Sequence, residues 1–579
     1  MSVTITALLL LAAIQEPSSV PGSLRGPQEG TLLELTTLQV AGQERSSKPH
    51  FNIGYSASGL NRWEFWFEHE RDVLFRGEPD FPARAVNETG NYGAETWSVE
   101  RQDLLLTSMP LLIDALHSEV PAIREAAALS LGRIGYPAAD IFLQRTTRDK
   151  VESVRQAAYM GLGLMATEQG VEFLIKTFEE ADSNTTRAFA ALGLGLSGRV
   201  ESGTVLKSYL NKVYYNASWA AQEDLMMAVM LASGVHGSND FTPLLMNLVK
   251  AMEEDGGAAR LRTSGIQALG ALADRRARPL LEAALQETGF GIATAAAQAL
   301  GRLGDKGAVG ALANTVRESN DQGLRGLCLL AIGRLGGNQA EAVLKELRPT
   351  RKEEESLHAA WAIAAGFAKY DGAYSELVAI LLHGTDDKKR SEDATPRRDE
   401  EDLRGAAAVA LGMYGAPGAK TQIERCLSMK NVSPTFRGYL ATGLGFLGTD
   451  AADELLLQLA SAEKLTPAER RGIATGLGLA SSEKTSVALV KMLIEDQDDA
   501  VRWAASRALA TSRSSAALRL LADRLRQELG AQNQNIQAAH LVMGLGFLGD
   551  THSGATISSM LAGMDYRQES RLMLALSHY

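Results

Sequence analysis

Residues 123–134 read IREAAALSLGRI, and variants of this stretch recur along most of the chain. Each variant ends in a unit of the form ALGxLG, whose first glycine, or the small residue in its place, is called the marker below. A period of about 20–50 residues is the signature of a solenoid, in which each repeat packs on its neighbours. The steps between markers are 31, 32, 37, 38, 31, 32, 33, 46, 33, 33, 32 and 36 residues. The markers are Gly132, Gly163, Gly195, Ala232, Gly270, Gly301, Gly333, Gly366, Gly412, Gly445, Gly478, Ala510 and Gly546.

The repeat unit is predicted to be a helix, a tight turn and a second helix. The first helix covers 123–134 and the second begins over 138–145, with Gly135 at the helix end, where a left-handed backbone favours glycine. Glycine inside a helix costs about 1 kcal/mol relative to alanine. Its recurrence therefore indicates close helix packing. The same first helix is expected at 154–165, 261–272, 324–335, 403–414, 436–447 and 501–510.

Composition limits the partners of this chain of 579 residues. The net charge of -11 argues against a nucleic-acid or anionic membrane partner, because such binding depends on clustered Lys and Arg. Aromatic residues make up only 6% of the chain, which suits closely packed Ala, Leu and Gly helices. The two cysteines, Cys328 and Cys426, lie about three repeats apart, too far for a disulfide. Two free, buried thiols are expected.

The N-terminal residues differ from the repeats. The apolar run ITALLLLAAI at 5–14 is too short to span a bilayer, which takes about 20 residues, but has the length of a signal-peptide core. We expect a signal peptide over 1–15 and export to the periplasm or the extracellular space. The alternative is an ordinary N-terminal helix on a cytoplasmic protein, since residues 1–4 contain no basic residue. Residues 16–50, rich in Pro, Gly and Ser, are expected to form a linker.

The segment 51–102 is predicted to cap the first repeat. Trp63, Trp66 and Phe67 have i, i+3, i+4 spacing, which places three rings on one helical face. The open apolar side of a terminal repeat needs such a cover. The repeats themselves are expected to occupy 103–579.

An arginine stands eight residues before most markers. Its fixed register with the helix favours a structural ladder, in which each guanidinium bonds an acidic or carbonyl group of the neighbouring repeat. An anion-binding stripe is the alternative. His358 replaces the arginine in one repeat, and Arg571 holds the same place in a final partial unit. The ladder comprises Arg124, Arg155, Arg187, Arg262, Arg325, Arg404, Arg437, Arg470 and Arg502.

With its arginine, the repeat resembles HEAT repeats, in particular the short repeats of phycobilisome lyases. Val154-Arg155, Ala158 and Leu162-Gly163 match the pattern V-R-x-x-A-x-x-A-L-G-x-[LI]-G of those repeats. The resemblance implies an all-α fold, a right-handed α-solenoid (a HEAT-like superhelix) of about 13 to 14 two-helix repeats. The segment from Trp63 to His69 is similar to the W-x-x-W-W-x-x-N segment of exported HEAT-repeat proteins of planctomycete-type bacteria, with Phe67 and His69 departing from it.

Two irregular places break the period. Residues 386–402, within a predicted loop at 384–403, are charged at 13 of 17 positions and are expected to form a mobile loop. Between Gly195 and Gly270 two long steps bring Tyr214, Tyr215 and Trp219 close together in the sequence. These three rings are candidate partner contacts, because interface hot spots favour Tyr and Trp. The alternative is that they fill the gap left by a longer loop.

Catalytic and ligand-binding motifs are not convincing in this chain. G-x-G-x-x-G occurs at Gly193, Gly443 and Gly544, but at helix ends and in step with the repeat, which indicates packing glycines. Glu68-His69-Glu70 is a poor metal site, because consecutive helical residues diverge by about 100°. We therefore predict no catalytic residue, no cofactor and no metal.

The leading hypothesis is a non-enzymatic scaffold that binds another protein on an extended concave surface lined by the second helices. One alternative is an enzyme-associated, lyase-like module that binds a small molecule such as a tetrapyrrole. Nucleic-acid binding, which needs a basic concave face, is disfavoured by the acidic balance. The sequence does not predict the oligomeric state or the partner.

Overall fold

The computed structural model describes residues 101–216, 222–254, 258–287, 291–349, 355–383, 398–416, 418–429, 432–512, 514–531, 534–535 and 537–550. These residues form 26 α-helices, six short 3-10 helices and, within the same ranges, no strand. The prediction of an all-α solenoid is confirmed. Arg571 and the segments 1–15, 16–50 and 51–100 lie outside the described residues.

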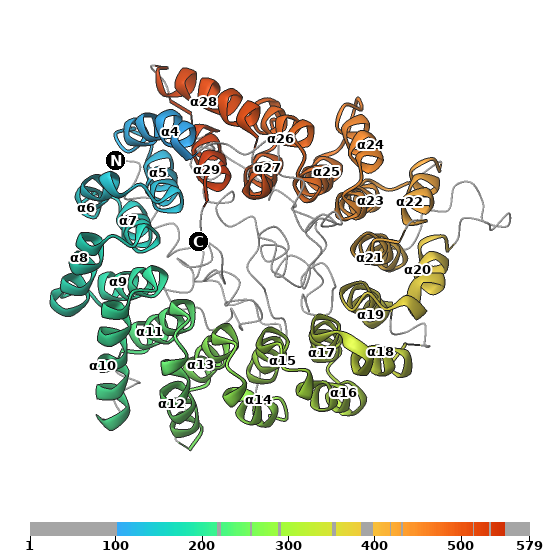
Figure 1. Ribbon diagram of the computed structural model, residues 1–579, viewed down its shortest axis with the longest axis horizontal. Coiled ribbons are helices and arrows are strands. Elements are labelled where there is room, and N and C mark those ends of the chain that lie inside the picture. The colour runs from blue at the N-terminus through green and yellow to red at the C-terminus, as the bar shows by residue number, and fades with distance from the viewer. Residues whose placement is uncertain are drawn as a thin grey trace, which may run out of the picture.

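The helices alternate between an inner and an outer layer (Figure 1). The thirteen inner helices carry the markers or end just before them, and those expected from the sequence end where predicted or within two residues. The inner helices are α5 Pro121–Ile134, α7 Glu152–Met165, α9 Asn184–Ser197, α11 Glu223–His236, α13 Ala259–Leu272, α15 Ile292–Leu303, α17 Gln322–Leu335, α19 Glu355–Phe367, α21 Arg398–Tyr414, α23 Pro434–Leu447, α25 Pro467–Ala480, α27 Asp499–Ala508 and α29 Gln537–Leu548.

The outer helices are more variable in length, and each packs against the inner helix that follows it. They are α4 Arg101–Ala115, α6 Asp140–Thr146, α8 Glu168–Glu180, α10 Val200–Asn216, α12 Thr242–Glu254, α14 Arg278–Ala284, α16 Val309–Glu318, α18 Gly337–Glu346, α20 Tyr374–Leu381, α22 Ala419–Leu427, α24 Asp450–Ala460, α26 Glu483–Glu495 and α28 Ser515–Leu529. The 3-10 helices are η2 Pro137–Ala139, η4 Asn239–Phe241, η5 Arg275–Ala277, η6 Lys306–Ala308, η8 Asp371–Ala373 and η9 Leu509–Thr511.

The layering corrects one expectation. We expected the second helix of each unit to line the concave surface, but the marker helices line it and the second helices form the outer wall (Figure 1). The reason is steric. The curved wall crowds its inner layer, and only helices with Gly and Ala at the contacts can approach so closely.

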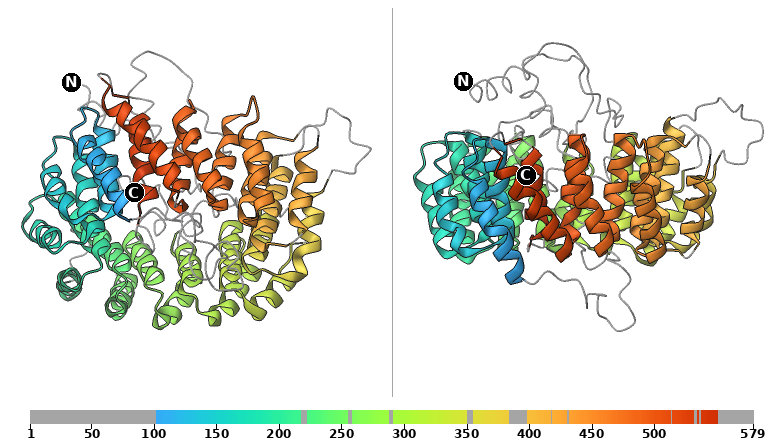
Figure 2. Two further views of the ribbon diagram at one scale, coloured as in Figure 1. Left: turned by 45° about the horizontal axis from the view of Figure 1, so that its top comes forward. Right: turned by 90° about the horizontal axis from the view of Figure 1, so that it is seen from above.

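The two ends of the described stack meet and close it into a ring (Figure 1). The last inner helix, α29, packs against the first, α5, and α28 packs against α4. The Ser118 hydroxyl bonds the Gln534 side chain across this seam, and Arg133 lies 3.8 Å from Asp550. Seen from the side in Figure 2, the helices run roughly along the ring axis and form a band. The sequence did not predict this closure.

The contact between the last and first inner helices uses the same repeat positions as the contacts between neighbouring inner helices along the wall. Along the wall, a Cβ on the marker glycine would strike the residue two places before the next marker, as with Gly163 on Gly193, at 2.2 Å from its carbonyl oxygen. A Cβ on Gly546, the last marker, would lie 2.2 Å from the hydroxyl oxygen and 2.8 Å from the Cα of Ser130. Ser130 is two places before Gly132, the first marker. The seam therefore repeats the contact found between ordinary neighbours.

The same register corrects one marker. The Cβ of an alanine at Gly195 would strike Ala232, which therefore lies two places before a marker. The left-handed Gly237 bonds the carbonyl of Gly234, as Gly198 bonds that of Gly195. Gly234 is thus the marker in this repeat, and our assignment of Ala232 was wrong. The sequence alone did not identify this marker, because both steps beside it are long. With Gly234 as the marker, the steps from Gly195 and to Gly270 are 39 and 36 residues.

Helix ends follow the turn chemistry expected from the sequence. Gly135 ends α5 with φ 65° and donates its N–H to the Leu131 carbonyl. Some repeats place alanine there, such as Ala166 at φ 53°, and accept the strain of a left-handed alanine. The charged loop ends earlier than the predicted residue 403, because α21 begins at Arg398. Residues 384–397 lie outside the described ranges.

Candidate functional site

The large exposed apolar side chains of the described residues lie on one arc of the outer wall. Among the described residues they are Leu106 on α4, Ile141 on α6, and Val200 and Tyr215 at the two ends of α10. Their exposed fractions are 68%, 53%, 80% and 81%. The helices α4, α6, α8 and α10 follow one another along one side of the ring (Figure 1). Exposed apolar side chains on one side of a protein are candidates for an interaction site.

The predicted aromatic contacts separate into two kinds. Tyr214 is partly buried against the core, whereas Tyr215 is exposed, and the two rings meet edge to face at 5.5 Å. Tyr209, one turn earlier, packs edge to face on Phe178. Burial raises the pKa of Tyr209, and Arg187 partly offsets this effect. Trp219 lies outside the described residues. Of the two predicted contact residues that the structure describes, only Tyr215 is exposed.

Four ladder arginines form ion pairs with an Asp or Glu at or just before the N-terminus of the next inner helix. At Asp149, burial raises the pKa, but hydrogen bonds from Arg124 and the Val151 amide outweigh burial and hold the pKa below its ordinary value. Arg124 is 7% exposed and makes two bonds to that carboxylate, so the pair is well defined. The four pairs and one N–O distance of each are Arg124–Asp149 2.8 Å, Arg262–Glu287 2.9 Å, Arg437–Glu469 3.3 Å and Arg470–Asp496 2.6 Å.

Three more ladder arginines bond a carbonyl in the last turn of the outer helix before their own. These carbonyls lack a partner within the helix, and a cation at the helix C-terminus also suits its dipole. The bonds are Arg187 to Phe178 at 2.8 Å, Arg325 to Val316 at 2.9 Å and Arg404 to Leu381 at 3.0 Å. Of the other two arginines, Arg155 bonds the Asp149 carbonyl at 2.9 Å, and Arg502 pairs with Asp499 at 2.6 Å.

In the repeat with His358 at the ladder position, an arginine from another position in the sequence supplies the guanidinium. Arg348, in the segment before α19, pairs with Glu376 at 2.5 Å, and the His358 ring lies 3.4 Å from the same carboxylate. The pKa of His358 is lowered by burial, and Glu376 acts in the opposite direction. The position thus keeps a guanidinium and an acid although the sequence register is broken.

An apolar and basic belt on the inner face was missed by the sequence analysis. It consists of the residue after each marker, and most of these side chains are half-buried. Nine are apolar, three are arginine, one is threonine and none is acidic. The sequence could have revealed the belt, because its residues always stand one place after the marker. The inner belt comprises Arg133, Leu164, Leu196, Val235, Ala271, Arg302, Arg334, Phe367, Met413, Phe446, Leu479, Thr511 and Phe547.

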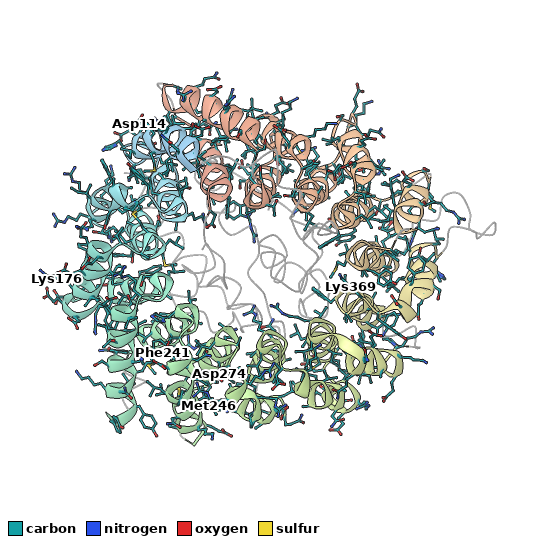
Figure 3. The ribbon with its side chains drawn as sticks, in the orientation of Figure 1. Asp114, Lys176, Phe241, Met246, Asp274 and Lys369 are labelled. Carbon is teal, nitrogen blue, oxygen red and sulfur yellow. The ribbon has the colours of Figure 1, made fainter. Side chains whose placement is uncertain are left out.

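Helix geometry places the inner belt on the inside of the ring. In α7, Gly161 and Gly163 contact the preceding and following inner helices, so they mark its two sides. Leu162 is fully buried between those sides, toward the outer layer. At about 100° per residue, Leu164 then points away from the outer layer. Figure 3 shows Lys176, on α8, at the outer circumference and Lys369, just after α19, on the inner side.

Belt residues touch one another across the seam. The Arg133 guanidinium lies 4.2 Å from the centroid of the Phe547 ring, a cation–π contact. Trp503 on α27 meets Phe547 edge to face, with ring centroids 6.3 Å apart, and the Arg507 guanidinium lies 5.9 Å from the Trp503 ring. An arginine guanidinium therefore lies beside an aromatic ring both at the seam and on α27.

The described residues hold no group of three His, Cys, Asp or Glu that could bind a metal ion. Glu68-His69-Glu70 lies outside them. Cys328 and Cys426 are free and buried, as predicted, and burial raises the pKa of both thiols. Within the described ranges, no helix has the length and apolar character needed to cross a bilayer. The first two glycines of each G-x-G-x-x-G motif lie in α9, α23 or α29 and serve helix contacts, and the third follows the helix end, as expected.

Comparison with known families agrees with this geometry. Residues 74–160, 245–333 and 462–539 match the family of HEAT repeats. These three regions carry HEAT repeats. The first match begins before residue 103, where we placed the start of the repeats. No curated protein matches the chain. The resemblance of the N-terminal segment to exported planctomycete-type proteins stays a prediction.

Several solved structures are similar to parts of the HEAT-repeat ring. The complex of CpcE and CpcF of phycocyanin lyase from Nostoc sp. PCC7120 is 20% identical, with a TM-score of 0.30, over 46% of this chain and 98% of that chain. Human deoxyhypusine hydroxylase in complex with glycerol is 20% identical, with a TM-score of 0.23, over 60% of this chain and 98% of that chain. A chain from a study of the interaction between cadherin and beta-catenin is 15% identical, with a TM-score of 0.25, over 84% of this chain and 97% of that chain.

Proposed function

We propose that this protein is a non-enzymatic scaffold whose outer wall binds another protein. The observation that carries the proposal is that Leu106, Ile141, Val200 and Tyr215 are exposed on α4, α6 and α10, three of four successive outer helices. Water-exposed groups of this size tend to be buried in a complex, and tyrosine is favoured at interface hot spots. HEAT repeats are in general suited to protein interaction.

The wall supplies rigidity for such a contact. Its inner helices approach one another at glycine and alanine, and ladder arginines fix inner helices to the loops or outer helices beside them. A rigid surface loses little conformational freedom on binding. The outer arc can therefore present its four side chains in a fixed arrangement.

The other hypotheses receive less support. A lyase-like module would bind a small molecule, and absorbance or mass spectrometry of the purified native protein would detect a bound pigment. For nucleic acid, the net charge of -11 opposes association with a phosphate backbone. The inner belt contains three arginines, but nine of its thirteen positions are apolar, which suits a protein segment better than phosphates.

The test compares partner recovery by matched variants. Tyr215→Ser combined with Ile141→Ser removes apolar surface from the outer arc, and Lys491→Ser on α26 changes an exposed residue on another part of the wall. We expect the first variant to lose a cross-linked partner from native-host extract that wild type and Lys491→Ser retain. Equal recovery by all three proteins, with unchanged melting temperatures, would exclude the arc as the binding surface.

Export remains part of the proposal, on the basis of the apolar run at 5–14. Cleavage after residue 15 would leave Glu16 as the first residue. Mass spectrometry of the protein from its native host should then detect this N-terminus in an exported fraction. An intact Met1 in the cytoplasm would contradict the proposal.

A further inference from the structure

The ring leaves no position in its wall for residues before Arg101. On one side α5 packs against α7, and on the other it packs against α29, while α4 packs against α28. We expected residues 51–102 to cover the open side of the first repeat, yet α28 and α29 cover that side. The expected cap lies outside the described residues, but the surface assigned to it is already occupied.

The composition of residues 51–100 is unlike that of the wall. It contains ten of the 34 aromatic residues of the chain, including Trp63, Trp66 and Phe67. Nine acidic residues and four arginines give it a net charge of -5, by subtraction of nine from four. Such a segment carries both apolar rings and negative charge, and it needs a surface that accepts both.

The inner belt has the complementary chemistry. Its positions are apolar or arginine, with no acid among the thirteen. One of its arginines, Arg133, already makes a cation–π contact at the seam, 4.2 Å from the centroid of the Phe547 ring. Guanidinium groups bind both carboxylates and aromatic faces. The belt is therefore suited to a segment rich in aromatic and acidic residues.

Size and connectivity permit the contact. If neighbouring inner helices are about 8–10 Å apart, the axes of the thirteen helices lie on a circle with a diameter of roughly 33–41 Å. The helices themselves, with their side chains, take up about 10–12 Å of that diameter, one helix radius on each side. An extended chain covers about 3.3 Å per residue, so 50 residues can cross this circle. Residue 100 is bonded directly to α4 at the seam, and such a tether gives an effective concentration of about millimolar.

We propose that residues 51–100 of the same chain bind the inner belt, with their aromatic rings on its apolar positions and their acids near Arg302 and Arg334. The segment thus acts as an internal ligand of the ring, separate from the outer arc. A protein partner that used the inner face would have to displace it.

Cross-linking in the full chain tests this proposal. A cysteine at Glu68 leaves Trp63, Trp66 and Phe67 in place and is paired, in separate proteins, with a belt cysteine at Leu164, Ala271 or Leu479. The control pairs it with Ile141→Cys on α6, the outer helix that packs against the Leu164 helix α7. The native thiols are buried and do not compete for a short bismaleimide.

At least one belt pair should give an intramolecular cross-link in about tenfold greater yield than the outer pair. The double variant Arg302→Glu and Arg334→Glu should lower that yield several-fold, whereas Lys491→Glu should not. If the double variant does not fold, Arg302→Gln serves in its place. Cross-links to the outer wall, links between two copies, or no link at any belt position would overturn the proposal.

Discussion

The hydroxyl of Ser130 on α5 donates to the carbonyl oxygen of Val542 on α29 at 2.9 Å, although the two residues are 412 positions apart. This bond joins the first and last described inner helices and closes the ring. A linear solenoid leaves two end repeats with one side exposed, and these ends need caps. Closure removes both ends, because each repeat then has two neighbours.

Closure should depend on the glycine opposite Ser130. Gly546→Ala places a Cβ 2.8 Å from the Ser130 Cα, so the backbone of one helix must shift, at a cost of about 1–3 kcal/mol. Gly310→Ala on α16 is the control, because nothing lies within 4 Å of its added Cβ. It should stabilise the protein by about 0.5–1 kcal/mol. Urea unfolding measures both, and small-angle scattering should show an expanded ring for Gly546→Ala alone.

The ladder should contribute to stability. Arg325→Ala removes the donor to the Val316 carbonyl and should lower the free energy of unfolding by about 1–3 kcal/mol. Arg317→Ala on the neighbouring outer helix is the comparison. Arg317 pairs with Glu346 at the surface, and such pairs contribute about 0–1 kcal/mol. Thermal unfolding measures both, and loss of partner binding by Arg325→Ala without loss of stability would instead assign the arginine to a binding site.

Acid should weaken the seam through His540 on α29. Burial lowers the pKa of His540 to about 4, Asp499 acts to raise it and Arg502 to lower it. The folded protein thus holds this histidine neutral, whereas the unfolded chain protonates it near pH 6.5. Stability is complete above pH 6.5 and falls as the pH drops toward 4, by about 3 kcal/mol at most. Denaturant midpoints across this range should fall for wild type and vary less for His540→Asn.

The two neighbouring tyrosines of α10 should respond differently to truncation. Tyr214 packs on the core, so Tyr214→Ser should lower the melting temperature by several degrees. Tyr215 is 81% exposed, and Tyr215→Ser should change the free energy of unfolding by less than about 0.5 kcal/mol. Differential scanning fluorimetry separates them. Equal destabilisation would show that both rings fill the gap of the long repeat.

The two native thiols should be unreactive until the ring unfolds. Cys328 is completely buried on α17, and burial raises the pKa of Cys328, which suppresses the thiolate that reacts. A colourimetric thiol reagent should therefore label neither Cys328 nor Cys426 in the native protein and both in denaturant. Rapid labelling of either thiol in native buffer would contradict the packing of these helices.

Much of the fold follows from local sequence. The period of Gly, Ala and Leu places the inner helices, as in α5, α17 and α23, whose last residues Ile134, Leu335 and Leu447 agree with the prediction. These signals are local because helix ends depend on the backbone freedom of one residue and on bonds within one turn. The arginine register was visible for the same reason, since it repeats at a fixed distance from the marker.

The candidate site was only partly visible in the sequence. Tyr215 could be proposed from its irregular repeat, but Leu106, Ile141 and Val200 have no distinctive pattern, and only the packed structure shows that they are exposed. The inner belt has a pattern, yet its orientation depends on which helix forms the inner layer. Which helix of each repeat forms the inner layer depends on how closely the helices of neighbouring repeats can pack in the curved wall, and not on the sequence of any single repeat.

By itself, the sequence determined an all-helical stack of two-helix repeats with small residues at the contacts. The tertiary structure decided that the marker helices face inward, that Gly234 replaces Ala232 in the register, and that Gly546 meets Ser130 to close the ring. The physical reason is that closure depends on the sum of small rotations over thirteen interfaces. Each rotation is set by side chains of two neighbouring repeats, so no local pattern shows whether the last helix reaches the first.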